Sequence, residues 1–439
     1  MAMTWSRLLS AQRLGHQGAE PVTPARNPFQ KDWDRVVFCS AFRRLQDKTQ
    51  VHSLPESDYV RNRLTHSLEV SSVGRSLGAQ VGESVVQRHG ADLGGVTAAE
   101  FGHIVAAACI GHDIGNPPFG HFGEATIQHW FRSGPGAELV RPLTAPQRSD
   151  FLHFEGNAQG FRVMSRLQNW RDAGGLRLTC ATLATFMKYP FGSQAADPAK
   201  GKFGHFAAEA GLFEDMAGAV GLEALGGGRH ARHALTWLVE AADDICYSVV
   251  DIEDGYKLGR ITFAEAEERL HALLQRMPPR YREIADEPWK IAYLRAKVIG
   301  DLIDLAVTVF LDCEPAIMTG RYDGDLMAET PVAGALAEIA AFTRARIFET
   351  RERFQTEVMG GEILTSLLDA FCDAHLALEM AGGEFAALAP RQRALLRLMP
   401  QPPQAGAARY EWLLSVTDFI SGMTDSYALK QFQRLRGLQ

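Results

Sequence analysis

Three segments of this chain combine helical patterns of apolar residues with side chains that bind metal ions. The first segment carries His66, the second carries His112 and Asp113, and the third carries Asp243 and Asp244. Imidazole and carboxylate groups together form a mixed nitrogen and oxygen ligand set for a divalent cation. Such groups are costly to bury in apolar helices unless something pairs them. The sequence therefore predicts a helical fold that gathers these segments around a metal ion.

The spacing of apolar residues supports each of the three helices. From His66 onward, apolar residues recur at steps of three and four, which is one helical face: Val70, Val73, Leu77 and Val81. Residues 104–110 are apolar all round, as expected of a helix that is buried on every side. In the third segment, Asp243, Tyr247 and Asp251 are four residues apart and share one helix edge. An acid, an aromatic ring and an acid along one edge can line a pocket.

Each of these residues also has a simpler interpretation. A single histidine such as His66 is usually a hydrogen-bonded core residue, and Asp113 alone can cap a turn. An Asp-Asp pair in the middle of a helix usually faces solvent. The joint pattern, with a His-Asp pair directly after an apolar helix, favours the metal site over these interpretations.

The chain resembles the HD superfamily of metal phosphohydrolases, and within it the dGTPase-like deoxynucleoside triphosphate (dNTP) triphosphohydrolases. The matching segments keep the family's order over nearly the whole chain: 42–51, 62–70, 111–124, 154–162, 187–191, 200–206, 240–256 and 418–429. A His-Asp pair alone is weak evidence, whereas GHDIGNPPFGHFGE followed by FEGNAQG is highly specific. The resemblance implies an enzyme that attacks the α-phosphate and releases a deoxynucleoside and inorganic triphosphate.

The resemblance implies metal ligation by His66, His112, Asp113 and Asp243. It selects Asp243 over Asp244 because the family's sugar-binding Tyr and Asp follow the ligand by four and eight residues. Asp244 is then a substrate contact or a neighbour of the ligands.

The resemblance also implies that His121 and Glu124 act at the reacting phosphate. His121 follows a Pro-Pro turn and can face the open side of the site, and Glu124 is close enough along the helix to orient the imidazole. The simpler interpretation is a histidine at a helix start with an acid in the first turn.

The remaining implied residues contact the substrate. Tyr247 would pack on the deoxyribose, and Gln50 and Asp251 would bind its 3′-hydroxyl. The implied contacts near the phosphates are Arg63, Asn157, Lys188, Tyr189 and Lys202, with His153 as a further candidate. A loop lysine is ordinarily just solvated. No GxxxxGK[ST] motif is present, which excludes a P-loop as the phosphate cradle.

The ligand types leave the divalent metal open, with Mg²⁺ or Mn²⁺ expected first and Fe²⁺, Co²⁺, Ni²⁺ or Zn²⁺ as further candidates. Mg²⁺ prefers oxygen ligands, whereas two imidazoles favour Mn²⁺, Fe²⁺, Co²⁺, Ni²⁺ or Zn²⁺. Two other functions also remain open. One is a different HD phosphohydrolase that acts on monophosphates or cyclic nucleotides, and the other is a nucleotide-sensing binder without catalysis.

Composition agrees with a cytoplasmic enzyme. At 439 residues and 46% hydrophobic, the chain can bury a large core. The net charge of −7 argues against a dominant nucleic-acid surface. Six scattered cysteines without a CxxC motif indicate reduced thiols. We find neither an apolar signal core nor a run of about 20 apolar residues, so we expect no membrane span.

The chain is expected to be all-α. We predict an N-terminal arm over 1–34, an HD-type catalytic core over 35–287, and a C-terminal helical region over 288–439 packed on the core. A short β-hairpin is expected near 185–206, and a loop over 221–230.

Two expectations concern partners. The family is commonly oligomeric, and apolar helices after residue 288 could supply interfaces. The basic C-terminal end leaves room for a nucleotide or single-stranded DNA effector, although a solvated helix end is its ordinary interpretation: Lys430, Arg434 and Arg436.

Overall fold

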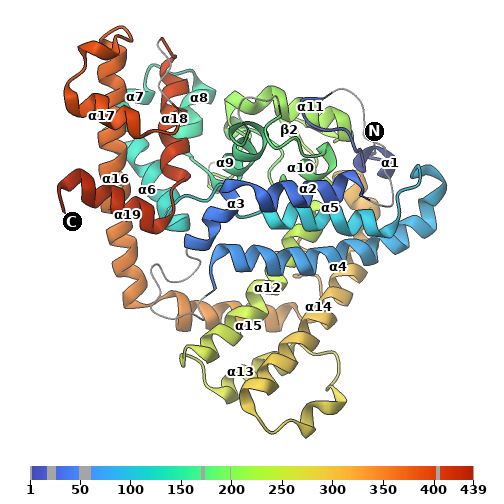
Figure 1. Ribbon diagram of the computed structural model, residues 1–439. Helices are drawn as coiled ribbons and strands as arrows, with labels where there is room; N and C mark the ends of the chain where they lie inside the picture. The colour runs from blue at the N-terminus through green and yellow to red at the C-terminus, as the bar shows by residue number, and fades with distance from the viewer. Residues whose placement is uncertain are drawn as a thin grey trace.

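Helices form almost all of the regular structure in the computed structural model, which describes residues 2–16, 26–48, 61–169, 174–197, 199–401 and 406–438 (Figure 1). The first helices are α1 (Trp5–Leu8), α2 (Pro28–Phe38), α3 (Ser40–Arg44), α4 (Arg63–His89), α5 (Ala98–Gly111), α6 (Gly120–Ser133), α7 (Gly136–Val140), α8 (Ala145–Leu152), α9 (Gly156–Arg162), α10 (Cys180–Phe186) and α11 (Ala210–Val220). The others are α12 (Thr236–Lys257), α13 (Phe263–Ala272), α14 (Glu287–Met318), α15 (Ala333–Thr343), α16 (Arg351–Met380), α17 (Pro390–Leu398), α18 (Arg409–Ser421) and α19 (Asp425–Arg436). The predicted all-α class is confirmed.

Helices α4 and α5 form an antiparallel pair at the centre of the fold. Each begins with a capping box, at Asn62 and Thr97, which pairs backbone N–H groups that a helix start leaves open. Glycines let the backbones approach closely, because a Cβ on Gly78 would lie 2.7 Å from the carbonyl oxygen of Phe101. Gly82 and Gly102 make comparably close backbone approaches, whereas at Gly74 the neighbour is the Cys109 side chain. The start of α4 therefore lies beside the end of α5.

Helix α12 packs against α4 and α14 and completes the centre of the fold (Figure 1). Its predicted apolar stripe is buried along its whole length: Leu235, Leu238, Val239, Ala242, Ile245, Cys246 and Val249. The predicted inward face of α4 is buried too: His66, Val70, Val73, Leu77 and Val81. The edge of α12 that carries Asp243, Tyr247 and Asp251 thus lies next to the start of α4.

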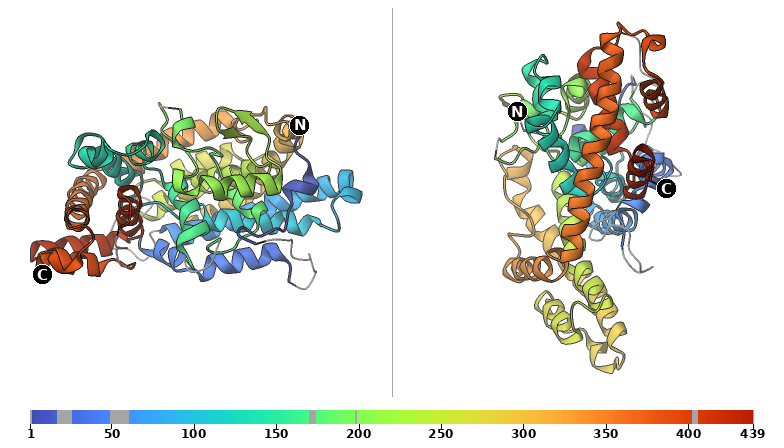
Figure 2. Two further views of the ribbon diagram at one scale, coloured as in Figure 1. Left: turned by 90° about the horizontal axis from the view of Figure 1, so that it is seen from above. Right: turned by 90° about the vertical axis from the view of Figure 1, so that its left-hand side faces the viewer.

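A second apolar cluster joins α6 and α8 to the C-terminal helices. Its aromatic and aliphatic side chains are buried, among them Phe131, Phe151, Leu367, Phe371 and Leu413. The long helix α16 runs beside α6, and α17, α18 and α19 pack along α16 (Figures 1 and 2). The C-terminal part of the chain therefore contacts the segment that carries His121.

The position expected for the β-hairpin was wrong. The described residues form strands β1 (Ala224–Gly226) and β2 (Arg229–His230), which pair antiparallel within the segment predicted as a loop. Positive φ angles of 82°, 60° and 75° at Gly226, Gly227 and Gly228 allow the chain to reverse there. Within 185–206 the described residues form no strand, and their only β-pairing is in isolated bridges.

The N-terminal residues are tied to the rest of the fold. Trp5 and Leu8 of α1 are buried, and the Met3 N–H donates to the Met318 carbonyl oxygen at 2.9 Å. Helix α2 begins at Pro28 after an Asn27 capping box. In the part of the chain that the structure describes, no helix is both long enough and apolar enough to cross a membrane.

Candidate active site

His66, His112 and Asp113 come together where α4 begins and α5 ends. His66 lies in the first turn of α4, and His112 caps the end of α5. One ligand atom from each of the three residues lies within 4.8 Å of the others. The antiparallel packing of α4 on α5 produces this cluster from residues that are about fifty positions apart in the sequence.

Two ligand atoms of this cluster are buried without a hydrogen-bond partner among the described residues. They are His112 Nε2 and Asp113 Oδ2. His112 Nδ1 lies 2.7 Å from the Cys109 carbonyl oxygen, which can only accept, so the ring proton is on Nδ1 and Nε2 carries a lone pair. A lone pair and a carboxylate oxygen buried together fit a divalent cation, because a cation would satisfy both.

The other oxygen of Asp113 is held by two donors. Arg63 Nη1 donates to Asp113 Oδ1 at 2.5 Å, and Asn116 Nδ2 donates to it at 2.6 Å. Burial alone would raise the pKa of Asp113, but the Arg63 guanidinium, through its charge and its hydrogen bond, lowers it to about 2. The carboxylate is therefore ionised at neutral pH, as a metal ligand must be.

Asp243 reaches the same cluster from α12. Its Oδ1 lies 2.9 Å from His66 Nε2 and 3.7 Å from His112 Nε2. At the adjacent Asp244, burial and the neighbouring charge of Asp243 raise the pKa to about 7. All four predicted metal ligands thus lie together, and Asp244 lies beside them.

Tyr247 and Asp251 extend this edge of α12 away from the cluster. The Tyr247 ring centroid is 4.9 Å from that of His66. Tyr247, Ser248 and Asp251 line one wall of a cavity of about 440 Å³. The other wall comes from α15, the short π-helical turn after it and α16: Ala340, Thr343, Arg344, Phe348, Glu349, Arg353, Phe354 and Glu357. Burial and the charge of Asp254 raise the pKa of Asp251 to about 7. Two residues of the predicted helix edge, Tyr247 and Asp251, thus line a pocket, whereas Asp243 contacts His66 instead.

His121 and Glu124 form a hydrogen-bonded pair at the start of α6. His121 Nδ1 lies 2.9 Å from Glu124 Oε2, and the His121 side chain is 79% exposed. Glu124 is buried, and its Oε1 accepts from the Gly156 N–H at 2.8 Å. Burial would raise the pKa of Glu124, but His121 and Lys202 lower it. A buried ionised carboxylate therefore orients an exposed imidazole.

Glu155 is a functional candidate that the sequence analysis missed. It is buried, and its Oε1 accepts from Lys202 Nζ at 2.7 Å and from Asn157 Nδ2 at 3.0 Å. Lys202 Nζ also lies 3.5 Å from Glu124 Oε2. Glu155 thus links two predicted phosphate contacts to the His121–Glu124 pair. A glutamate directly before a helix start was the available signal, since its carboxylate caps α9.

The other predicted contacts have the following neighbours. Lys188 Nζ lies 2.7 Å from Glu240 Oε1, and the ammonium group is 5.9 Å from the centre of the Tyr189 ring. His153 borders the loop that carries Lys202, because a Cβ on Gly201 would lie 3.8 Å from its ring. Gln50 lies outside the described residues.

Comparisons with known proteins agree with the geometry of the site. The pattern described as "HD domain" matches residues 63–171, and the pattern described as "Phosphohydrolase-associated domain" matches residues 326–434. A protein of Synechocystis sp. named "Deoxyguanosinetriphosphate triphosphohydrolase-like protein" is 42% identical, over 99% of this chain and 100% of its own. A Pseudomonas aeruginosa protein of the same name is 40% identical over 99% of both chains. The "Deoxyguanosinetriphosphate triphosphohydrolase" of Klebsiella pneumoniae is 30% identical over 94% of both chains.

Proposed function

The chain belongs to the deoxyguanosinetriphosphate triphosphohydrolase-like family, and we propose that it is a metal-dependent hydrolase of dNTPs. Water would attack the α-phosphorus, the bond from phosphorus to the 5′-oxygen would break, and a deoxynucleoside and inorganic triphosphate would leave. The observation that carries the proposal is the His66–His112–Asp113 cluster, in which two buried ligand atoms have no hydrogen-bond partner among the described residues. A nucleotide binder without catalysis has no need of that cluster beside an oriented histidine.

Four side chains would hold the divalent cation: His66, His112, Asp113 and Asp243. A bound divalent cation polarises a phosphoryl oxygen and makes a bound water more acidic. With two imidazoles in the set, we favour Mn²⁺ over Mg²⁺, and Fe²⁺, Co²⁺, Ni²⁺ and Zn²⁺ are compatible with the same ligands. Arg63 has a supporting role here, because its guanidinium fixes the Asp113 carboxylate at 2.5 Å.

His121 would move the proton in the reaction. Its Nδ1 faces the Glu124 carboxylate at 2.9 Å, so the neutral ring holds its proton there and Nε2 is the basic atom. Nε2 can then orient and deprotonate the attacking water, and the buried Glu124 carboxylate stabilises the imidazolium that forms. The proton can pass from this imidazolium to the leaving 5′-oxygen.

Cationic and amide groups would bind the triphosphate. Lys202 and Asn157 both contact the buried Glu155, which restricts their positions before substrate arrives. Burial lowers the pKa of Lys202, but the charges of Glu155 and Glu124 raise it above its usual value, so the ammonium stays charged. We assign Lys188, Tyr189 and His153 to the same phosphate-binding side.

The deoxyribose would lie against Tyr247. The ring is next to His66, so a sugar attached to the reacting phosphate would reach it. Asp251 lines the adjoining cavity and would bind the 3′-hydroxyl together with Gln50. A 2′-hydroxyl on the ring face would lose its water partners, which disfavours ribonucleotides.

The setting of the enzyme is part of the proposal. All six cysteines are unpaired thiols, as is usual in the cytoplasm. Exposed apolar side chains on α16, Phe354 and Val358, support a homo-oligomer. A nucleotide or single-stranded DNA effector remains an expectation from the family.

Product analysis tests the proposed function. Purified protein would be incubated with each of the four dNTPs, with Mg²⁺ and Mn²⁺ separately, and the products separated by anion exchange. We expect deoxynucleoside and intact inorganic triphosphate in equal amounts. Orthophosphate or pyrophosphate as the product would instead indicate a different HD phosphohydrolase.

A further inference from the structure

The turn before α6 is held in an unfavourable backbone conformation. Phe119 has φ 62° and ψ 17°, which is the left-handed region that residues with a side chain rarely adopt. Gly120 follows with φ 59°, and His121 is the second residue of α6. The direction in which His121 leaves the turn therefore depends on keeping Phe119 in this conformation. Such a conformation persists only where surrounding contacts hold it.

The C-terminal helices supply those contacts. The Phe119 N–H donates to Asp425 Oδ1 at 3.0 Å, and Asp425 is only 2% exposed. The Phe119 ring lies against bare backbone of α16, because a Cβ on Gly360 would be 2.7 Å from the ring. Gly361 makes room for Phe122 in the same way, at 3.3 Å. Phe119 and Phe122, which flank His121 in the sequence, are thus packed against α16. The turn itself is hydrogen-bonded to Asp425 at the start of α19.

Lys48 attaches the segment that contains Asp425 to the catalytic region at a second point. Lys48 is buried, and its Nζ donates to the Ser421 carbonyl oxygen at 2.7 Å and to the Asn116 carbonyl oxygen at 2.5 Å. Lys48 thereby joins the end of α18 to the turn that follows Asp113. Residues 418–425 belong to a segment singled out in the sequence, DFISGMTDSYAL, that none of the roles above uses.

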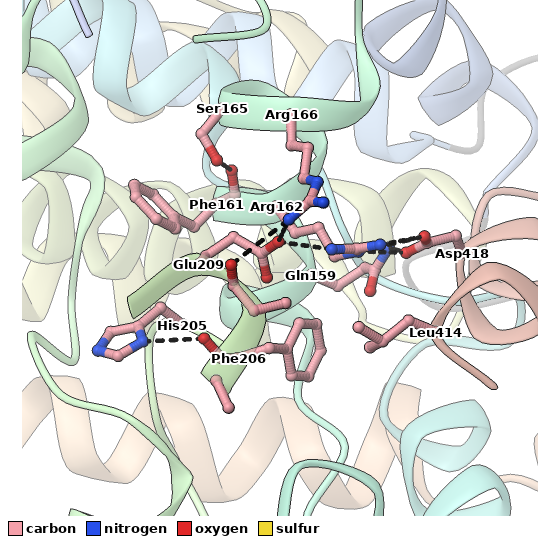
Figure 3. Close-up of polar contacts among 12 residues, drawn as sticks. Gln159, Phe161, Arg162, Ser165, Arg166, His205, Phe206, Glu209, Leu414 and Asp418 are labelled. Carbon is pink, nitrogen blue, oxygen red and sulfur yellow. Dashed lines mark hydrogen bonds and ion pairs between the residues drawn. The ribbon is translucent and has the colours of Figure 1, made fainter. Parts of the chain in front are cut away.

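The third attachment is a buried ion-pair group (Figure 3). Arg162 Nη2 lies 2.8 Å from Asp418 Oδ2, and Arg162 Nη1 lies 2.5 Å from Glu209 Oε1. Gln159 Nε2 donates to Asp418 Oδ1 at 2.9 Å. Because Gln159 and Arg162 belong to α9, this group fixes α18 against the helix that Glu155 caps. Residues 418–425 are therefore anchored on both sides of the Phe119 turn.

We propose that Asp425 is a positioning residue for catalysis, which fixes the left-handed turn at Phe119 and, through it, the imidazole of His121. The inference rests on the proposed function, since it assumes that His121 acts in hydrolysis. Asp425 would not touch the substrate. Its loss would let Phe119 relax toward ordinary backbone angles and displace His121 from the reacting phosphate.

The test measures kcat, KM and bound metal for Asp425→Ala, below the temperature at which any variant unfolds. We expect kcat to fall roughly 10–100-fold, as displacement of a reacting group by about 1 Å does, with little change in KM and full metal content. Asp425→Asn keeps an oxygen acceptor for the Phe119 N–H and should restore most of the turnover. Thr424→Ala is the matched control, because it removes the α19 cap at Tyr427 without touching Phe119.

A double-mutant cycle decides whether Asp425 acts through His121. In a His121→Ala background, Asp425→Ala should have no further effect on kcat, since no imidazole is left to position. Full additivity, or an equal kcat loss in Thr424→Ala, would overturn the inference and indicate general destabilisation. If Asp425→Ala does not fold, Asp425→Glu, which keeps the charge but displaces the acceptor, carries the same cycle.

The two proposals fail in distinguishable ways. No triphosphate release by the unmutated protein would reject the proposed function. Normal release, a large effect of His121→Ala and an unchanged kcat in Asp425→Ala would reject only the positioning role.

Discussion

Two histidine sites of this protein have opposite hydrogen-bonding patterns. His233 is 0% exposed, and both ring nitrogens have partners: Nε2 lies 2.9 Å from the Leu8 carbonyl oxygen, and Nδ1 accepts from the Leu235 N–H at 3.2 Å. At the end of α5, His112 Nδ1 has a backbone partner, but the buried Nε2 has none among the described residues. The His233 ring thus completes a local hydrogen-bond network, whereas the His112 ring has an Nε2 lone pair that faces His66 and Asp243.

This difference separates His112 from a structural histidine such as His233. Burial does not separate the two kinds of histidine, because His66 and His233 are both buried, and His66 Nε2 lies 2.9 Å from the Asp243 carboxylate. A histidine with both nitrogens satisfied as the neutral ring has no capacity left for a ligand. A buried nitrogen without a partner needs an explanation, and a metal ion provides one.

The largest expected effect is the loss of metal from His112→Ala or Asp113→Ala. Metal affinity should fall by more than the roughly 10–100-fold that follows loss of an outer partner, and turnover should fall with it. Chelation of the unmutated protein should lower both activity and thermal stability, because the ion links three helices. Metal content by mass spectrometry is the measurement. His233→Gln, which keeps an N–H donor, is the control and should retain the metal. Full metal occupancy in both His112→Ala and Asp113→Ala would contradict their assignment as ligands.

A third histidine, the exposed His121, should behave differently from both buried sites. His121→Ala should keep its metal and its dNTP affinity while turnover falls by roughly 10²–10⁴-fold. Steady-state kinetics together with metal analysis separate these effects. Unchanged turnover would remove His121 from the reaction, and loss of metal would make it a ligand.

Protonation of His233 should lower the free energy of unfolding in acid. Burial lowers the pKa of His233 from the ordinary 6.5 to about 4. Between these values the unfolded chain binds a proton that the folded chain does not, so the free energy of unfolding falls as the pH falls from 6.5 to 4. The loss should reach about 3 kcal/mol. Urea unfolding of the unmutated protein and of His233→Gln checks this, and an equal pH dependence in both would contradict it.

The smallest effect concerns the ring that packs beside His66. We expect dNTPs to be hydrolysed better than ribonucleotides by the equivalent of about 1–3 kcal/mol, because a 2′-hydroxyl against Tyr247 would be buried without a partner. Tyr247→Ala should narrow this gap mainly by weakening dNTP use, and dideoxy substrates should be poor. Competition kinetics with dGTP and GTP measure the gap. Equal rates in the unmutated protein would reject the sugar contact.

Local patterns in the sequence predicted the helical half of the site. The period from His66 to Val81 identified the buried face of α4, and the apolar run before His112 identified the end of α5. No local pattern indicated how closely α4 and α5 approach each other. The glycines that allow this close approach are found in many other environments, so their presence in the sequence does not predict it. The division of the chain at residues 34 and 287 stays a prediction.

Long-range contacts could not be predicted. Asp425 and Phe119 are 306 positions apart, and nothing near Phe119 in sequence indicates a left-handed residue, since its side chain disfavours one. The role of Glu155 could not be predicted because its contact with Lys202 joins two segments that are 47 residues apart. A local pattern shows only that Glu155 caps α9. The β-hairpin lies at residues 224–230 and not near 185–206, because consecutive glycines are compatible with both a tight hairpin turn and an open loop.

The glycines between α4 and α5 also bear on which cation the protein takes up from a mixed cellular supply. Bare backbone meets bare backbone at Gly78, so the separation of the helices is set there and not by the ligands. A methyl group at that position would push α4 away from α5 and move His66 relative to His112. Selectivity among divalent ions follows ligand spacing and rigidity. Residues that never contact the ion would thus act as a size filter, and Gly78→Ala should shift the preference toward larger ions.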